Sequence, residues 1–187
     1  MITECIILAA GYSSRANTNK MLLSLRNKTV IECCIDSFYA TCSKIYVVGG
    51  YRMEEIVPVL TKYDNLELVY NAHYPEGMFR SVKEGLTYIK GDRFFLTPGD
   101  YPLIKKETLD KMLDIDEPIV IPKYDGIGGH PVLMRSSLTP EILSGRFESL
   151  REFITTKKPL YVEVDDIGVV TDIDYMEDYY RITSQLS

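Results

Sequence analysis

The sequence has 187 residues, of which 45% are hydrophobic and 26% are charged, and its formal net charge is −6 at pH 7. A chain of this length can bury a sizeable core, and this composition disfavours intrinsic disorder. The negative net charge, with no long Lys and Arg cluster to offset it, argues against binding to a nucleic-acid backbone.

Export, membrane insertion and metal binding by cysteine are also disfavoured. No basic segment precedes an apolar stretch at the N-terminus, and no apolar run approaches the ~18 residues of a spanning helix. We therefore expect a cytoplasmic protein without a membrane partner. The four cysteines form no CxxC pair and lack His at metal-ligand spacing, which disfavours a zinc site. Adjacent Cys33 and Cys34 lie in an apolar helical pattern, so buried free thiols are expected there rather than a redox role.

Seven short apolar runs alternate with helical patterns along the chain. The expected strands span 4–9, 44–49, 66–70, 93–97, 118–121, 131–134 and 160–164. The expected helices span 30–39, 53–61, 79–89, 106–113, 148–155 and 175–183. This alternation predicts an α/β protein, a single domain over residues 1–187 with a three-layer α/β/α Rossmann-like fold and a mostly parallel, mixed sheet.

Local patterns refine this prediction. The strands that contain residues 6–8, 45–48 and 94–96 are continuously apolar, which is typical of central strands buried on both faces. Acidic residues in 66–70 and 160–164 place those strands nearer an edge. Thr29 is expected to cap the first helix, with Glu32 completing a capping box.

Polar loops follow three of the expected strands, at residues 9–20, 71–81 and 98–102. In open parallel sheets the ligand binds beyond the carboxyl ends of the strands, and these ends share one edge. We therefore expect the three loops to converge on one site.

The first of these loops carries small residues and two cations. It lacks both the Walker pattern and GxGxxG, which argues against a P-loop ATPase or a Rossmann dehydrogenase. Ala9, Ala10 and Gly11 leave backbone amides open to a nucleotide. Arg15 and Lys20 are spaced to bind a triphosphate, and the alternative is a surface loop with solvated cations.

The second and third loops offer an anion site and a carboxylate. Gly77 marks a turn, and Ser81 falls in the first turn of the expected helix, where unpaired amides suit an anion, although Ser81 could equally serve as a local backbone partner. Asp100, within Pro98-Gly99-Asp100, ends a buried strand and is well placed to bind Mg²⁺. The alternative is a turn in which Asp100 bonds its own backbone.

Two later segments complete the candidate site. Gly129, His130 and Pro131 belong to a glycine-rich loop that could close over a bulky second substrate, with a structural histidine as the alternative. Asp172 and Asp174 alternate along an extended segment and so point to opposite sides. We expect one to bind Mg²⁺ with Asp100 and the other to cap the last helix. Asp174 is placed for the cap, which favours Asp172 as the metal ligand, and a structural role for both is the alternative.

Taken in order, these segments resemble the molybdenum cofactor cytidylyltransferases, a MobA-like family of GT-A-like nucleotidyltransferases. The family motif LAAGxSxRMGxxK is matched from Leu8 to Lys20, except that Ala16-Asn17 replaces Met-Gly. Segments similar to NPxxxxGMxxSL, GDQP, GxxGHPV and DIDTPEDY follow at 71–82, 99–102, 126–132 and 172–179. Tyr101 replaces the usual Gln, and of the family's GDxGAR only Gly145 and Arg151 are kept.

The resemblance implies Mg²⁺-dependent transfer of CMP from CTP to a phosphorylated acceptor, molybdopterin, with release of pyrophosphate, the product serving a molybdenum hydroxylase apo-enzyme. Ala10, where related guanylyltransferases usually carry Gly, favours CTP over GTP. The residues assigned to the site are Arg15, Lys20 and Asp100 for catalysis; Leu8, Ala9, Ala10, Gly11, Arg15, Lys20, Gly77, Ser81, Pro98 and Gly99 for the nucleotide; Gly129, His130 and Pro131 for the second substrate; and Asp100, Asp172 and Asp174 for the metal.

Two other functions remain open at this point. One is a nucleotidyltransferase that acts on a sugar phosphate or on an alcohol phosphate such as phosphocholine. The other is a non-catalytic chaperone that binds the finished molybdenum cofactor, which the replacements at Asn17 and Tyr101 would motivate.

Overall fold

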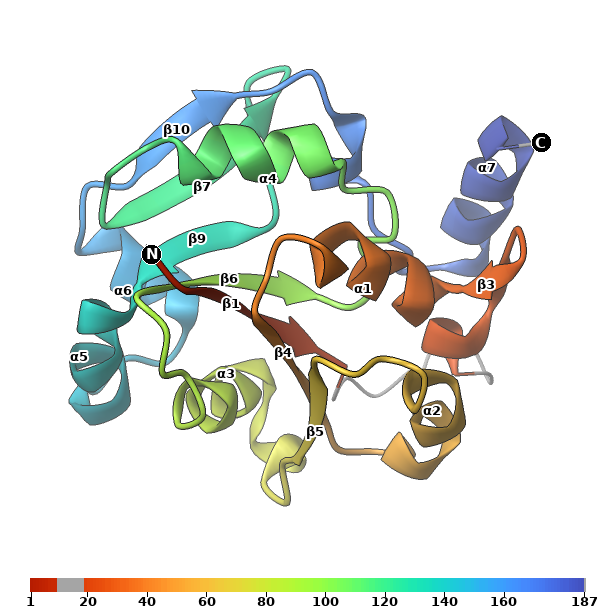
Figure 1. Cartoon of the computed structure of the whole chain (residues 1–187), viewed down its shortest axis with the longest axis horizontal. Helices are drawn as coiled ribbons and strands as arrows, with labels where there is room; N and C mark the ends of the chain where they lie inside the picture. The colour runs from red at the N-terminus through yellow and green to blue at the C-terminus, as the bar shows by residue number, and fades with distance from the viewer. Residues whose placement is uncertain (10–18, 187) are drawn as a thin grey trace.

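A computed structural model describes residues 1–9 and 19–186, which pack around one large sheet with helices on both faces (Figure 1). The strands of this sheet are β1 (Thr3–Leu8), β4 (Lys44–Gly49), β5 (Leu66–Tyr70), β6 (Arg93–Pro98), β7 (Ile119–Tyr124), β8 (Ile127–Gly128), β9 (Val132–Arg135) and β10 (Leu160–Glu163). The helices are α1 (Val30–Tyr39), α2 (Met53–Leu60), α3 (Met78–Leu86), α4 (Lys106–Leu113), α5 (Thr139–Ser144), α6 (Leu150–Thr155) and α7 (Met176–Leu186). The predicted three-layer α/β/α architecture is confirmed.

The strand order is β10-β7-β9-β6-β1-β4-β5, with β8 paired to β7. Neighbours β6, β1, β4 and β5 are all parallel, and so are β7 and β10, whereas β9 runs antiparallel to both β6 and β7. The predicted mixed, mostly parallel sheet is therefore correct. Because β9 is reversed, the loop that precedes it lies at the same edge as the carboxyl ends of the other strands.

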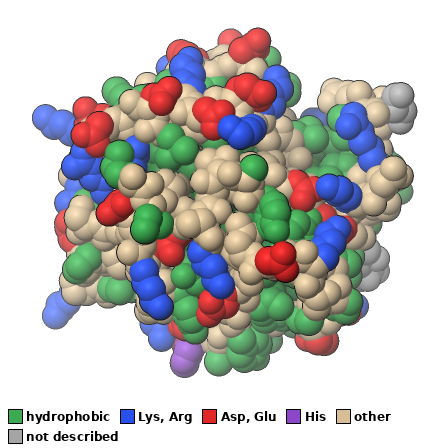
Figure 2. Space-filling model, viewed as in Figure 1, with side chains coloured by type: hydrophobic (Ala, Val, Ile, Leu, Met, Phe, Trp, Pro, Cys, Tyr) green, Lys and Arg blue, Asp and Glu red, His purple; other side chains and the backbone are tan. Residues whose placement is uncertain are grey.

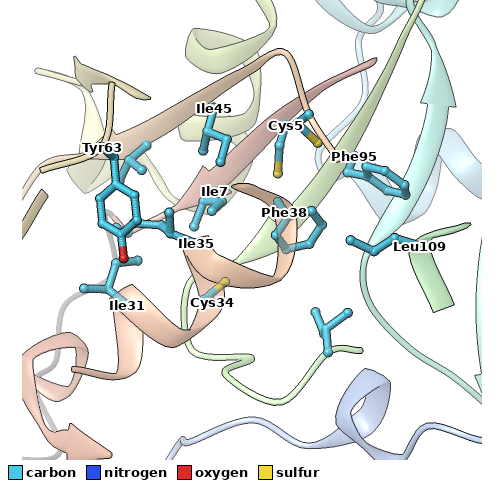
Figure 3. Packing of buried hydrophobic residues seen from close by; sticks show 14 of the residues in the cluster. Cys5, Ile7, Ile31, Cys34, Ile35, Phe38, Ile45, Tyr63, Phe95 and Leu109 are labelled. Atoms are coloured by element: carbon cyan, nitrogen blue, oxygen red, sulfur yellow. The ribbon is translucent and has the colours of Figure 1, made fainter. Parts of the chain in front are cut away.

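The continuous apolar runs reflect burial on both faces of the central strands. In β1, Cys5 and Ile7 face a core cluster with α1, α2 and α4, shown in Figure 3, while Ile6 and Leu8 face a second cluster with α3, α5 and α6. This is the period-two alternation of a strand, with both halves apolar. The strands predicted to lie near an edge, β5 and β10, are the two ends of the sheet.

Local sequence signals set several element ends. Thr29 caps α1, since its hydroxyl accepts from the backbone N–H of Glu32 while the Glu32 carboxylate accepts from the backbone N–H of Thr29, as predicted. All four cysteines are free thiols, and Cys34 is buried as expected, whereas Cys33 is only half-buried. The six-residue α5 was not predicted, because it is too short for a clear helical period, although its Ile142 is fully buried.

A short hairpin of β2 (Ser24–Leu25) and β3 (Lys28–Thr29) was also not predicted. It packs against α7 through a small third cluster that includes Leu25 and Ile182, and α7 stands at the side of the molecule next to this hairpin (Figure 1). Figure 2 shows Lys and Arg side chains interspersed with Asp and Glu over the face in view. Among the described residues, no helix is both long and apolar enough to cross a membrane.

Candidate active site

Lys20 and Asp100, predicted from separate loops, meet at the carboxyl edge of β1 and β6. Lys20 opens the short 3₁₀ helix Lys20–Leu22, which Asn19 caps, and Asp100 follows β6, where the Gly99 backbone N–H donates to the Leu8 carbonyl at 2.9 Å. The Lys20 ammonium donates to Asp100 Oδ2 at 2.6 Å, and their side chains are only 17% and 12% exposed. The end of the first loop and the third loop therefore meet, as expected.

Asp174 is the second acceptor of Lys20, at 3.2 Å. Burial lowers the pKa of Lys20, but the charge and hydrogen bond of Asp100, with a smaller contribution from Asp174, reverse this and raise its pKa above the ordinary value. Lys20 is thus firmly cationic. Asp100 Oδ1 is buried and has no hydrogen-bond partner in the described part of the chain, so this carboxylate has an unused acceptor directed into the protein.

The segment that carries Asp172 and Asp174 is joined to Asp100 through its backbone, because the N–H of Ile173 donates to the Asp100 carbonyl at 3.1 Å. The predicted cap of the last helix is wrong. Asp174 pairs with Lys20, whereas Asp178 Oδ2 accepts from the backbone N–H groups of Asp174 and Tyr175 at 3.3 and 3.0 Å. A carboxylate in the first helical turn can satisfy these groups as well as one before it.

Asp172 lies in the same negative field. Burial raises the pKa of Asp172 above its ordinary value, and the charges of Asp174 and Asp100 raise it further. Over residues 1–9 and 19–186, no three His, Cys, Asp or Glu side chains are grouped so as to hold a metal ion. The three aspartates are therefore neighbours without forming a complete three-carboxylate site, and their assignment to a metal stays a prediction.

The glycine-rich loop before β9 reaches this same edge. Gly129 has no room for a side chain, because a Cβ there would lie 2.0 Å from the carbonyl oxygen of Val169. This close packing holds the backbone N–H of His130 on the Val169 carbonyl at 2.8 Å. Pro131 is buried as β9 begins.

His130 lies against the ring of Tyr101, with the ring centroids 4.8 Å apart in an edge-on arrangement. Burial lowers the pKa of His130, while the nearby charge of Asp100 and a hydrogen bond to the backbone of Leu96 oppose the shift. Its Nδ1 is inaccessible to solvent and has no partner among the described residues. Tyr101, noted only as a departure from the family pattern, thus connects Asp100 to the histidine loop.

The loop after β5 is built differently from the expectation. Ser81 is 2% exposed, and its hydroxyl accepts from Asn71 Nδ2 at 3.0 Å, so it supports the loop from inside as a local partner. Asn71 Oδ1 in turn accepts from the backbone N–H of His73 at 2.9 Å. Gly77 precedes α3 with a φ of 105°, which a non-glycine residue rarely adopts. A nucleotide contact by Ser81 or Gly77 stays a prediction.

A cavity of about 890 Å³ opens beside this edge, between the sheet and helices α3 and α6. Its lining includes four of the predicted site residues, Leu8, Pro98, Gly129 and His130. Sequence reasoning did not assign Lys123 or Arg151 to a site, although both line the cavity. In the sequence, Arg151 stands out only as a remnant of a family motif. Lys123 lies in β7, beyond the end of the expected strand 118–121, and nothing in the sequence distinguishes it from an ordinary surface lysine.

Four residues that the sequence singles out lie outside the described residues: Ala10, Gly11, Arg15 and Asn17. Leu8 and Ala9 precede this gap as buried residues, and the Ala9 backbone N–H donates to the Val48 carbonyl at 2.8 Å, which continues the sheet pairing of β1 toward Lys20 and Asp100.

Known proteins share both this sequence and this fold. The chain is 29% identical over 178 residues to the molybdenum cofactor cytidylyltransferase of Escherichia coli K12, which covers 94% of this chain and 93% of the relative. A nucleotidyl transferase from Methanothermobacter thermautotrophicus superposes with a TM-score of 0.85 at 21% identity, covering 98% of this chain and 97% of the other.

Rv0371c from Mycobacterium tuberculosis H37Rv superposes with a TM-score of 0.83 at 22% identity, covering 98% and 97% of the two chains. A structure of Rv0371c in complex with manganese has a TM-score of 0.78 at 19% identity and covers 98% of this chain and 99% of the other. The family model of the MobA-like NTP transferase domain matches residues 5–160. The chain that brings Lys20 and Asp100 together at the end of β1 and β6 therefore belongs to the MobA-like NTP transferase family, and it is a nucleotidyltransferase.

Proposed function

We propose that this enzyme transfers the CMP group of CTP to the terminal phosphate of molybdopterin in a reaction that depends on Mg²⁺ and releases pyrophosphate. The observation that carries the proposal is the cluster of Lys20, Asp100 and Asp174, which sets a cation and two carboxylates together at the carboxyl edge of β1 and β6. The identity to the E. coli cytidylyltransferase over nearly the full length of both chains supports CTP and the molybdenum cofactor as substrates.

The residues present fit a divalent cation. Asp100 offers a buried Oδ1 without a hydrogen-bond partner in the described residues, and Asp172 has its pKa raised partly by neighbouring carboxylates, a repulsion that a cation would relieve. Mg²⁺ needs only one or two protein carboxylates, because waters and phosphate oxygens complete its coordination. Asp100 and Asp172 would hold it, with Asp174 next to them. When bound, the ion would polarise phosphate oxygens and neutralise their charge. The manganese complex of Rv0371c supports a divalent ion in this fold.

The chemistry requires positioning and charge neutralisation more than a proton acceptor. A terminal phosphate oxygen of the acceptor, already deprotonated at neutral pH, attacks the α-phosphorus of CTP, and the bond to the oxygen bridging to the β-phosphorus breaks. The new bond is a phosphoanhydride, and the electron pair leaves with pyrophosphate. Lys20, kept cationic by Asp100, and Arg15 would stabilise the charge on the leaving group. No general base is needed, because the attacking phosphate oxygen carries no proton.

The test is a pyrophosphate-release assay with purified protein, Mg²⁺, molybdopterin and each nucleoside triphosphate in turn. We expect release that requires both Mg²⁺ and molybdopterin and is fastest with CTP. Release with glucose 1-phosphate or phosphocholine in place of molybdopterin would support the sugar- or alcohol-phosphate alternative. Tight binding of the cofactor without release would replace the proposal by the chaperone function.

Asp100→Ala should reduce the rate by at least about 100-fold, a typical loss for a group that organises transition-state charge. Asp110→Ala is the matched control, because Asp110 is an exposed α4 aspartate whose one ion pair with a described residue is with Lys106. Equal rates for the two variants would remove Asp100 from the mechanism.

A further inference from the structure

The last helix, α7, buries little apolar surface against the rest of the molecule. Ile182 is its one buried residue among those described, and it belongs to the small third cluster with Leu25, Val30 and Ile173. The helix stands beside the hairpin of β2 and β3 (Figure 1). Because the apolar contribution to its docking is small, the polar contacts of α7 carry much of the information about where it sits.

Tyr179 on α7 contacts the segment that carries Lys20. Its hydroxyl donates to the Ser24 carbonyl at 2.6 Å, although the two residues are 155 positions apart in the sequence. Ser24 begins β2, which follows the 3₁₀ helix Lys20–Leu22. The backbone N–H of Leu23 donates to the Lys20 carbonyl at 3.3 Å, so a tight turn joins this helix to the strand. The hydrogen bond of Tyr179 therefore holds the backbone directly after the turn that carries Lys20.

Asp178, the neighbour of Tyr179, holds the other side of the same ion pair. Its Oδ2 accepts from the backbone N–H groups of Asp174 and Tyr175 at 3.3 and 3.0 Å. The side chain of Asp174 is 53% exposed and accepts from the Lys20 ammonium at 3.2 Å. An exposed side chain has several rotamers open to it, so a fixed backbone limits where the Asp174 carboxylate can lie.

We propose that Asp178 and Tyr179 are positioning residues of the reaction. Asp178 holds the backbone of Asp174, and Tyr179 holds the segment that carries Lys20. Through these two adjacent residues α7 keeps Lys20 aligned between Asp100 and Asp174, so that the ammonium meets the triphosphate from one direction. The inference rests on the proposed function in one respect, since it takes Lys20 to be the group that contacts the triphosphate.

The alternative is that the core alone holds the Lys20 segment. The backbone N–H of Val30, at the start of α1, donates to the Leu23 carbonyl at 3.0 Å, and Met21 is buried in the large cluster beneath α1. These contacts fix Met21 and Leu23, but neither of them involves Asp174. Alignment of Lys20 with Asp174 therefore depends on α7, whose first turn holds the aspartate.

The first measurement requires no substrate. Reductive methylation of the parent, Tyr179→Phe and Asp178→Ala without metal or nucleotide, followed by peptide mass spectrometry, reports how readily the Lys20 amine reacts. Lys20 should react about threefold faster or more in both variants, because the loss of one hydrogen bond shifts a local equilibrium by about two- to tenfold. Lys106, an exposed lysine on α4, should react at the parent rate.

Three variants serve as controls. Tyr180→Phe and Glu177→Ala change exposed neighbours on the same helix. Ile142→Val removes one methylene group from a fully buried residue of α5 in the second cluster, so it should lower the urea midpoint by an amount similar to the loss of a hydrogen bond. In all three variants Lys20 should be methylated at the parent rate.

The second measurement is steady-state kinetics with CTP and molybdopterin. Tyr179→Phe and Asp178→Ala should each lower kcat/KM for CTP by about two- to tenfold, while the KM for molybdopterin stays within about twofold of the parent. Ile142→Val should leave both parameters unchanged at a temperature where every variant is folded.

The outcomes distinguish this inference from the proposed function. Parent-like methylation of Lys20 in either α7 variant would overturn the inference, because the core would then suffice to hold the residue. Equally fast methylation in Ile142→Val would overturn it too, since global stability would be the cause, and so would faster methylation with an unchanged kcat/KM for CTP. If methylation rises as expected but no triphosphate and acceptor support pyrophosphate release, the proposed function fails and the role of Asp178 and Tyr179 in holding Lys20 stands.

Discussion

Removal of the Lys20 ammonium should leave the carboxylate of Asp100 buried without its cationic partner. The perturbation is Lys20→Met, which keeps the length of the aliphatic chain and deletes the charge. Breaking a fully buried ion pair costs about 3–5 kcal/mol, whereas exposed pairs contribute about 0–1 kcal/mol. With side chains 17% and 12% exposed, this pair lies nearer the buried limit, so we expect a loss of about 2 kcal/mol in the free energy of unfolding.

The assay is urea unfolding of the parent, Lys20→Met, Asp100→Asn and the double variant at pH 7 without nucleotide. The double variant should be more stable than the sum of the single changes by about 1–2 kcal/mol, because Asn carries no charge to strand. Lys28→Met is the control, since it breaks an ion pair with Asp36 whose side chains are 48% and 33% exposed, and it should cost less than about 1 kcal/mol. A Lys20 variant no less stable than the Lys28 variant would refute the reasoning.

Three further predictions concern the neighbouring residues. Gly129→Ala should lower the free energy of unfolding by more than about 2 kcal/mol, because its Cβ would lie 2.0 Å from the Val169 carbonyl oxygen. Calorimetry should find a smaller loss for Gly128→Ala, because the nearest atom to a Cβ there is a Tyr161 ring atom at 3.0 Å. Asp172→Asn should stabilise the ligand-free protein by up to about 1 kcal/mol at pH 7, because folding raises the pKa of this acid and so disfavours its ionised form. The same variant should raise the Mg²⁺ concentration that gives half the maximal rate, and an unchanged melting temperature would count against this electrostatic account. Folding lowers the pKa of His130, so the unfolded state binds a proton more readily than the folded state. The free energy of unfolding should therefore fall as the pH drops from about 6.5 through the folded pKa. In His130→Gln, the midpoint of urea unfolding should depend less on pH over this range.

Much of the fold follows from patterns local to a few residues. Helix α1 has its predicted ends because Thr29 and Glu32 form a capping box that marks the start unambiguously. The central and edge strands were recognised because burial on two faces requires continuous apolar residues, whereas edges tolerate charge. The reversed direction of β9 was not predictable in this way, because an apolar run of four residues reads the same in either direction.

The candidate site likewise has a part that local sequence patterns predict and a part that they do not. Lys20 and Asp100 were predicted to lie in one site, because parallel strands bring the loops at their carboxyl ends to one edge, but the ion pair between them was not predicted. The Asp174 cap failed because sequence spacing alone cannot decide between Asp174 and Asp178 when a cation from residue 20 competes for one of them. The place of Arg151 beside the cavity was not predicted for a related reason, because it depends on how α6 packs over strands that are distant in the sequence.

Because β9 runs in the opposite direction, both halves of the chain contribute loops to the same edge of the sheet. Under the proposed function, loops that precede or include Asp100 would bind the nucleotide, while the loop that enters β9 and the segment after β10 come to the same edge from the second half of the chain. Under that proposal, changes of length or composition at 124–131 would act on the acceptor rather than on the nucleotide. A scaffold of this kind can exchange one substrate while retaining the other, so acceptor preference is a property that mutation can alter independently of the nucleotide.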